Sequence, residues 1–133
     1  MMKKRSVIFA VVVLTIVCAV VLPAPVRAEK ESVLTFELSE SGKEYIVKSC
    51  DSSVSGKLTI PSEHNGLPVT GIGWSAFYEC KQLTSVTIPD SVTTIGITAF
   101  AYCSSLKDVR IPDTVTSCDG RAFDGCNELS YNI

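Results

Sequence analysis

The sequence predicts a mainly β solenoid of about three 23-residue coils, with short helical or 3-10 turns and an N-terminal β-hairpin cap. The first observation behind this prediction is a repeat. Residues 86–106 align with residues 109–129 and share ten of 21 positions. The second is a looser copy at 58–83, which has the same pattern with five extra residues. A fixed period of about 20 to 50 residues is typical of solenoids.

Residues 1–28 have the pattern of a secretory signal peptide. Its parts are a positive start, an apolar stretch and a small-residue cleavage pattern, namely Lys3-Lys4-Arg5, residues 7–22 and Val26-Arg27-Ala28. We therefore expect the mature chain to begin at Glu29. Two alternatives stay open. One is lipoprotein cleavage at Cys18, although Val17 is bulky for such a site, and the other is an uncleaved anchor, although 16 apolar residues are slightly short for a membrane span.

Charge argues against some classes of partner. The whole chain has 12 basic and 14 acidic residues, and four of the basic ones leave with the signal peptide. The remaining domain of about 105 residues is net acidic, with a charge near −6 and no basic cluster. Nucleic acid and, after signal cleavage, the membrane are therefore not expected as partners.

Residues 29–57 carry no repeat and are predicted to form the capping hairpin. Leu34, Phe36 and Leu38 alternate with polar residues, and residues 44–48 are predicted to return as a second strand after a turn at 40–43. Such a hairpin would cover the backbone groups and apolar core at the open end of the first coil.

Each coil is predicted to begin with a short strand. Val86 and Ile88, like Val109 and Ile111, alternate with polar neighbours, which favours a strand with these β-branched residues pointing inward. A proline follows each strand and ends it, since proline donates no hydrogen bond. We place the repeats at 58–133, with coils at 58–82, 83–105 and 106–128 and the start of a fourth at 129.

The return half of each coil has apolar residues three positions apart, which suits a tight helical turn with one buried edge. These residues are predicted to form a structural core ladder of Phe77, Phe100, Phe123, Cys80, Cys103 and Cys126. Gly73 and Gly96 come just before, where a corner needs backbone freedom.

The C-terminal end has no recognisable cap, because the chain runs only four residues beyond Leu129. Three explanations stay open. The chain is part of a longer repeat protein, the uncapped end is closed by self-association, or the domain is marginally stable. We favour the first.

The combined pattern I-P-D-x-V and A-F-x-x-C-x-x-L, repeated every 23 residues, resembles the BspA-like leucine-rich repeats of bacterial surface proteins. The resemblance covers about Leu58 to Leu129. It departs from the pattern at Cys118-Asp119, where the other copies have Ile-Gly, and at the insertion SEHNGLP in the first copy. The resemblance implies a secreted or cell-surface protein that adheres through its sheet face to host or neighbouring-cell surface proteins or to matrix.

No residue pattern predicts catalysis, a metal site or a cofactor. The 23-residue interval between cysteines matches no zinc spacing, so we expect reduced core thiols, with Cys118 also in the core and Cys50 free. The single histidine, His64, lies in the polar insertion and is expected to be an exposed turn residue. A hydrolase with scattered carboxylates receives little support.

The remaining candidate is the outer side of the predicted strands. Six side chains there alternate with the inward residues and are the predicted ligand-binding set: Lys57, Thr59, Ser85, Thr87, Asp108 and Arg110. Trp74 and Tyr78 form a second candidate patch on the return side, unless Trp74 packs against the cap. The predicted partner is an extracellular or host surface protein, a matrix protein or a glycan. The alternative function is a structural spacer or targeting segment of a larger secreted protein.

Overall fold

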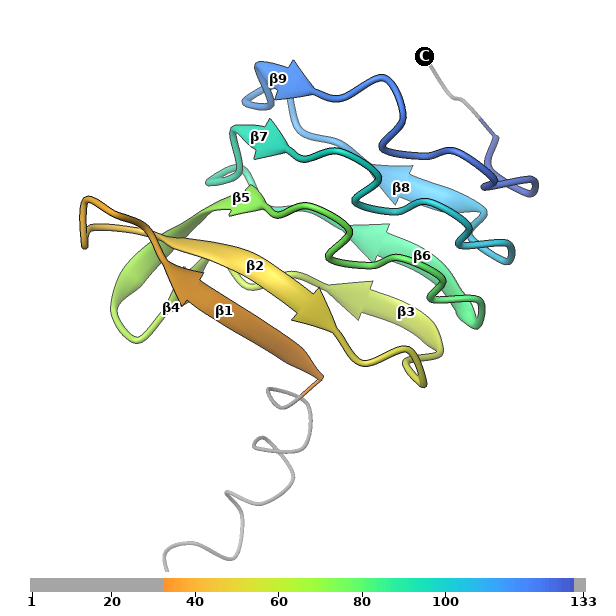
Figure 1. Cartoon of the computed structure of the whole chain (residues 1–133), viewed down its shortest axis with the longest axis horizontal. Coiled ribbons are helices and arrows are strands. Elements are labelled where there is room, and N and C mark those ends of the chain that lie inside the picture. Colours follow the sequence, from red (N-terminus) through yellow and green to blue (C-terminus); the bar gives the residue numbers. More distant parts are fainter. Residues whose placement is uncertain (1–32, 131–133) are drawn as a thin grey trace, which may run out of the picture. The chain divides into compact units, whose positions relative to one another are not determined.

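A computed structural model describes residues 33–130, which form a stack of three coils behind a hairpin (Figure 1). The predicted signal peptide lies outside the described residues. Nine strands and the turns between them make up residues 33–130, where no helix occurs. Accordingly, no helix in this range is long and apolar enough to cross a membrane. The predicted fold class, a mainly β solenoid, is confirmed.

The hairpin consists of β1 (Leu34–Leu38) and β2 (Tyr45–Cys50), which pair antiparallel. The turn between them closes through a bond from the Ser39 amide to the Glu44 carbonyl, and Gly42 adopts a φ of 69° there. Strand β2 then pairs parallel with β5 (Leu67–Ile72) of the first coil. The hairpin thereby covers an edge that would otherwise expose unpaired backbone groups.

One side of the stack is a three-stranded parallel sheet of β3 (Gly56–Thr59), β6 (Leu83–Thr87) and β8 (Asp108–Arg110). Val86 aligns with Leu58 on one neighbour and with Val109 on the other, so the apolar residues share one face. Proline follows within two residues of each strand and removes the donor needed to extend it.

The other side is a second sheet, which joins the predicted hairpin to strands of the coils that the sequence did not predict. It has the order β1-β2-β5-β7-β9, where β7 is Thr94–Ile95 and β9 is Ser117–Cys118. Strand β4 (Glu63–His64), from the insertion in the first coil, pairs antiparallel with β5. The two sheets enclose the apolar core between them (Figure 1).

The return segments at 74–79, 97–102 and 120–125 are turns, where short helical turns were expected. Along the first return segment, backbone amides bond alternately to a carbonyl of the same segment and to a carbonyl of the next coil. The Tyr78 amide bonds three residues back to the Ser75 carbonyl, whereas the Phe77 and Glu79 amides bond to the Ala99 and Ala101 carbonyls of the next coil. Because every second amide is used between coils, a continuous 3-10 ladder cannot form.

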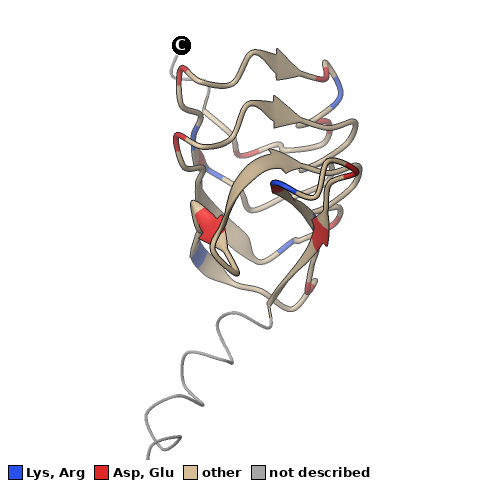
Figure 2. Ribbon diagram, turned by 90° about the vertical axis from the view of Figure 1, so that its left-hand side faces the viewer, with Lys and Arg blue, Asp and Glu red and all other residues tan. Residues whose placement is uncertain are grey.

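The core is a single cluster of apolar side chains, and no polar or charged residue of 33–130 is buried. Acidic and basic residues lie around the outside of the coils (Figure 2). The rings of Phe77, Phe100 and Phe123 are stacked in one file, with centroids 4.7 and 5.2 Å apart and nearly parallel planes. Each coil therefore completes its core with side chains of its neighbours.

Candidate binding surfaces

The six predicted ligand-binding side chains lie on the three-stranded sheet in two rows. Lys57, Ser85 and Asp108 occupy one register position on adjacent strands, and Thr59, Thr87 and Arg110 occupy the other. All are exposed except Ser85, which is half-buried. We call these two rows the three-stranded face. It is rigid, since its side chains stand on paired strands, and it carries both signs of charge.

The three-stranded face continues into a shallow hollow of about 410 Å³ at its edge. Arg110 lines this hollow with two carboxylates from equivalent turns, Asp90 and Asp113. Within residues 33–130, Arg110 takes part in no ion pair, because the three pairs involve Lys48, Lys81 and Arg121. Among the described residues, the Arg110 side chain is exposed at the edge of the three-stranded face.

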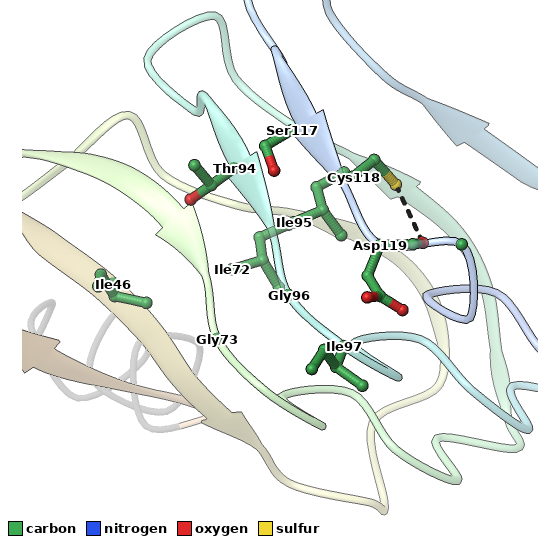
Figure 3. Close-up of a pocket in the computed structure, with 11 residues that line it drawn as sticks. Ile46, Ile72, Gly73, Thr94, Ile95, Gly96, Ile97, Ser117, Cys118 and Asp119 are labelled. Atoms are coloured by element: carbon green, nitrogen blue, oxygen red, sulfur yellow. Dashed lines mark hydrogen bonds between the residues drawn. The ribbon is translucent and has the colours of Figure 1, made fainter.

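A second hollow, of about 490 Å³, lies on the outer side of the sheet of β2, β5, β7 and β9 (Figure 3). Its floor contains Gly73 and Gly96, which have no side chain to fill the space. A Cβ at Gly96 would lie 3.0 to 3.1 Å from backbone atoms of the preceding coil. We call this feature the glycine hollow. The sequence alone indicated only corners at these glycines.

The walls of the glycine hollow differ in chemistry. Ile46 and Ile97 provide aliphatic walls, Thr94 and Ser117 provide hydroxyl groups, and Asp119 provides a carboxylate (Figure 3). The Asp119 Oδ1 atom accepts a bond from the Arg121 amide at 2.9 Å and lies 3.9 Å from Arg121 Nε.

The core cysteines are held by hydrogen bonds between coils. The Cys103 Sγ donates to the Phe77 carbonyl at 3.0 Å, and the Cys126 Sγ makes the same bond to the Phe100 carbonyl. Hydrogen bonds with the Cys126 and Cys80 side chains, together with burial, raise the pKa of Cys103. A buried thiol with a raised pKa is a poor nucleophile. Hydrogen bonds with the Cys103 side chain lower the pKa of Cys80 and of Cys126. Cys103 and Cys126 take a structural part in the stack through their bonds to carbonyls of the preceding coil.

The expectation of a core position for Cys118 was wrong. Cys118 is exposed, while Ile95 at the same register position one coil earlier has only 2% of its surface exposed. Ile95 is covered by β9, whereas β9 is the last strand of its sheet in residues 33–130. Cys50 is half-buried at the capped end, and both cysteines are free thiols.

The expectation that His64 is an exposed turn residue was also wrong. Its ring stacks on Phe36 at 4.1 Å and meets Tyr45 edge-on at 4.7 Å. The residue is half-buried because the β4–β5 hairpin folds back over the cap. His64 therefore joins the insertion to the hairpin.

The return side carries exposed aromatic residues. Trp74 is 77% exposed and does not pack against the cap, and Tyr78 meets Tyr102 edge-on at 5.5 Å. Gly125 makes room for Tyr102, since a Cβ there would lie 2.5 Å from the tyrosine ring. No group of three or more His, Cys, Asp or Glu side chains that could hold a metal ion occurs in residues 33–130.

A family model described as a BspA type leucine rich repeat region matches residues 43–133. No curated protein matches the chain.

Several solved structures are similar. A leucine-rich repeat protein of T. pallidum matches with a TM-score of 0.70 and 29% identity, covering 74% of this chain and 45% of its own. A leucine rich cell surface protein of Faecalibacterium prausnitzii has a TM-score of 0.62 and 36% identity, with coverages of 74% and 28%. A leucine-rich repeat protein of Bacteroides ovatus has a TM-score of 0.65 and 28% identity, with coverages of 74% and 27%. The chain thus spans less than half the length of these three proteins.

Proposed function

Because the chain belongs to the BspA-type leucine-rich repeat family, we propose that it is a non-enzymatic module that binds a protein at the bacterial cell surface. Support for the location comes from the signal-like pattern of residues 1–28 and from the F. prausnitzii protein, which is described as a cell surface protein. Secretion followed by adhesion to a host, matrix or neighbouring-cell protein is the specific form of this proposal.

The observation that carries the proposal is the register of the three-stranded face. Lys57, Ser85 and Asp108 repeat at one strand spacing, and so do Thr59, Thr87 and Arg110. Strands in a sheet lie about 4.8 Å apart, so each row offers polar groups at regular intervals along the stack. A partner can contact several of them without moving the backbone, and rigid surfaces lose little conformational entropy on binding.

Charge on the three-stranded face favours a polypeptide partner. Lys57 and Arg110 are exposed at opposite ends of the sheet, with Asp108 beside Arg110. Mixed charges at fixed positions give an interface its orientation and specificity more than its affinity. Arginine is also enriched among the residues that contribute most to protein interfaces.

The test uses the processed protein immobilised on a surface and probed with a panel of matrix proteins, host cell-surface proteins and glycans. The double variant Asp108→Ala with Arg110→Ala is expected to weaken the detected interaction at least about tenfold, since two neighbouring charged contacts are lost. The matched control is Glu40→Ala with Lys43→Ala, an exposed pair of the same charges in the hairpin turn. If the face variant leaves every interaction unchanged, binding does not use this sheet.

A second candidate is favoured by one observation, the coverage of the similar structures. Because the chain spans only 27% to 45% of the length of the first three, the same coils also suit a spacer or targeting segment within a larger secreted protein. This function predicts an open reading frame that continues beyond Ile133 and no ligand for these coils alone. A ligand bound by the processed protein would exclude it.

A further inference from the structure

We propose that the glycine hollow is a second binding site, which accepts a lysine or arginine side chain of a polypeptide. It lies on the sheet of β2, β5, β7 and β9, whereas the three-stranded face belongs to β3, β6 and β8. The two proposals therefore rest on different residues and can fail separately.

The shape of the glycine hollow suits a side chain with an apolar stem. Gly73 and Gly96 leave the backbone bare between two aliphatic side chains, Ile46 on the cap side and Ile97 below (Figure 3). Ile97 is 43% exposed and Ile46 is half-buried, so both present apolar surface to a guest. Lysine and arginine carry apolar stems that commonly lie along such surface while the charged group reaches a polar position.

The charge of the glycine hollow suits a cationic guest. Asp119 is the one charged residue among the lining residues, and its carboxylate points toward the hollow (Figure 3). Thr94 and Ser117, on neighbouring strands, add hydroxyl oxygens that can accept hydrogen bonds. A cationic group that bonds to a carboxylate makes a stronger hydrogen bond than a neutral group would. An anionic guest is disfavoured because the hollow has no cation in its lining.

A cationic side chain of the protein itself already lies beside the Asp119 carboxylate. Arg121, with 66% of its side chain exposed, holds its Nε atom 3.9 Å from Asp119 Oδ1. A pair this long and exposed contributes little free energy. The carboxylate is therefore already in contact with a guanidinium, which a guanidinium from a partner can replace with closer geometry.

The experiment titrates the processed protein with N-acetyl-arginine amide and N-acetyl-lysine amide at constant ionic strength. Binding is followed through the backbone amide resonances of Gly73 and Gly96 in two-dimensional NMR spectra. Saturable shifts of these two resonances are expected with the cationic probes. N-acetyl-norleucine amide has a similar stem without the charge, and methyl glucoside is a neutral sugar, and neither is expected to shift them comparably.

Two variants should change the affinity for the arginine probe in opposite directions. Asp119→Asn keeps an oxygen for the Arg121 amide but removes the charge, and it should weaken binding of the arginine probe about tenfold. Arg121→Ala removes the competitor and should strengthen binding a few fold. Asp113→Asn, which changes a carboxylate outside the glycine hollow, serves as the control and should leave the affinity unchanged.

Three results would overturn the proposal. Equal shifts with the norleucine probe would make the site a simple apolar depression. Stronger shifts with the glucoside would assign it to sugars, and the absence of any saturable shift would remove the site. Each of these results leaves the proposed role of the three-stranded face untouched, because Asp108 and Arg110 do not line the glycine hollow.

Discussion

The two ends of the stack bury equivalent residues to very different extents. At the capped end and in the middle, Phe77 and Phe100 are fully buried, whereas Phe123 in the third coil is half-buried. Ile88, which follows β6, is 3% exposed, and Ile111 at the same place after β8 is 44% exposed. A residue at a given coil position is therefore buried only where a further coil covers it. In repeat proteins, much of the stability comes from such contacts between neighbouring repeats.

The largest expected difference between the two ends is in thiol reactivity. In the folded protein, Cys118 should react with a thiol reagent, while Cys103 should react more than about a thousandfold more slowly, because it must wait for unfolding of a stack worth roughly 5 kcal/mol or more. Mass spectrometry of the alkylated protein would locate the modified cysteine. Equal rates at the two positions would show that the core is not closed.

Reaction at Cys118 should also depend on pH. Burial and the neighbouring Asp119 raise the pKa of Cys118, so its thiolate fraction is small at neutral pH. The rate should rise as the pH is raised and continue to rise past the ordinary pKa of a thiol.

After denaturation without a reductant, the processed protein should show close to five reactive thiols, and a count of one would contradict free core cysteines.

The next largest effect concerns the stacked phenylalanines. Phe100→Ala removes a ring that contacts partners on both sides and should lower the free energy of unfolding by about 3 to 5 kcal/mol. Phe123→Ala removes a half-buried ring with one stacked partner and should cost roughly half as much. Urea unfolding of both variants gives the ratio. Similar losses would mean that the third coil is covered as well as the second.

A third pair of variants replaces one glycine in the second coil and one in the third coil with alanine. Gly96→Ala places a Cβ 3.0 Å from two backbone atoms of the preceding coil and should cost roughly 1 to 3 kcal/mol, since overpacking forces the coils apart. Gly120→Ala meets nothing within 4 Å and should be neutral or slightly stabilising. Thermal unfolding of the pair measures the difference. A loss at Gly120 as large as that at Gly96 would show that overpacking against the preceding coil is not the cause of the loss at Gly96.

The smallest effect is expected at the cap. His64→Ala removes the ring that stacks on Phe36 and meets Tyr45, and it should cost about 1 kcal/mol. Glu63→Ala, one residue earlier in β4 and exposed, is the matched control and should change the stability little. If the two variants unfold at the same urea concentration, the insertion does not hold the cap.

The sequence predicted the solenoid because its period is long and its core positions recur. It did not predict β7 and β9, which extend the hairpin into a second sheet, because these strands are only two residues each and show no alternation. The glycine hollow was missed for a related reason, since Gly73 and Gly96 have a local explanation as corners. The recurrence of small residues before Trp74 and Ile97 was the available signal.

Contacts between residues far apart in the sequence explain why His64 and Cys118 differ from what the sequence predicted. His64 contacts Phe36, 28 positions earlier, and nothing in the local sequence of either residue indicates that contact. The exposure of Cys118 likewise depends on whether a further strand pairs with β9. The six residues of the three-stranded face could be named in advance because alternation along a strand determines which side chains point outward.

The hydrogen bonds that cross between coils make the fold extendable in fixed increments. The Ser130 amide donates to the Lys107 carbonyl, as the Lys107 amide donates to the Thr84 carbonyl 23 residues earlier. A duplicated 23-residue copy inserted between two coils would find the same donors and acceptors waiting on either side. The molecule would then lengthen by about 4.8 Å, one strand spacing. The hairpin and His64, which packs on it, would keep their contacts. Such a protein can change its reach by gene duplication alone, without redesigning a single contact.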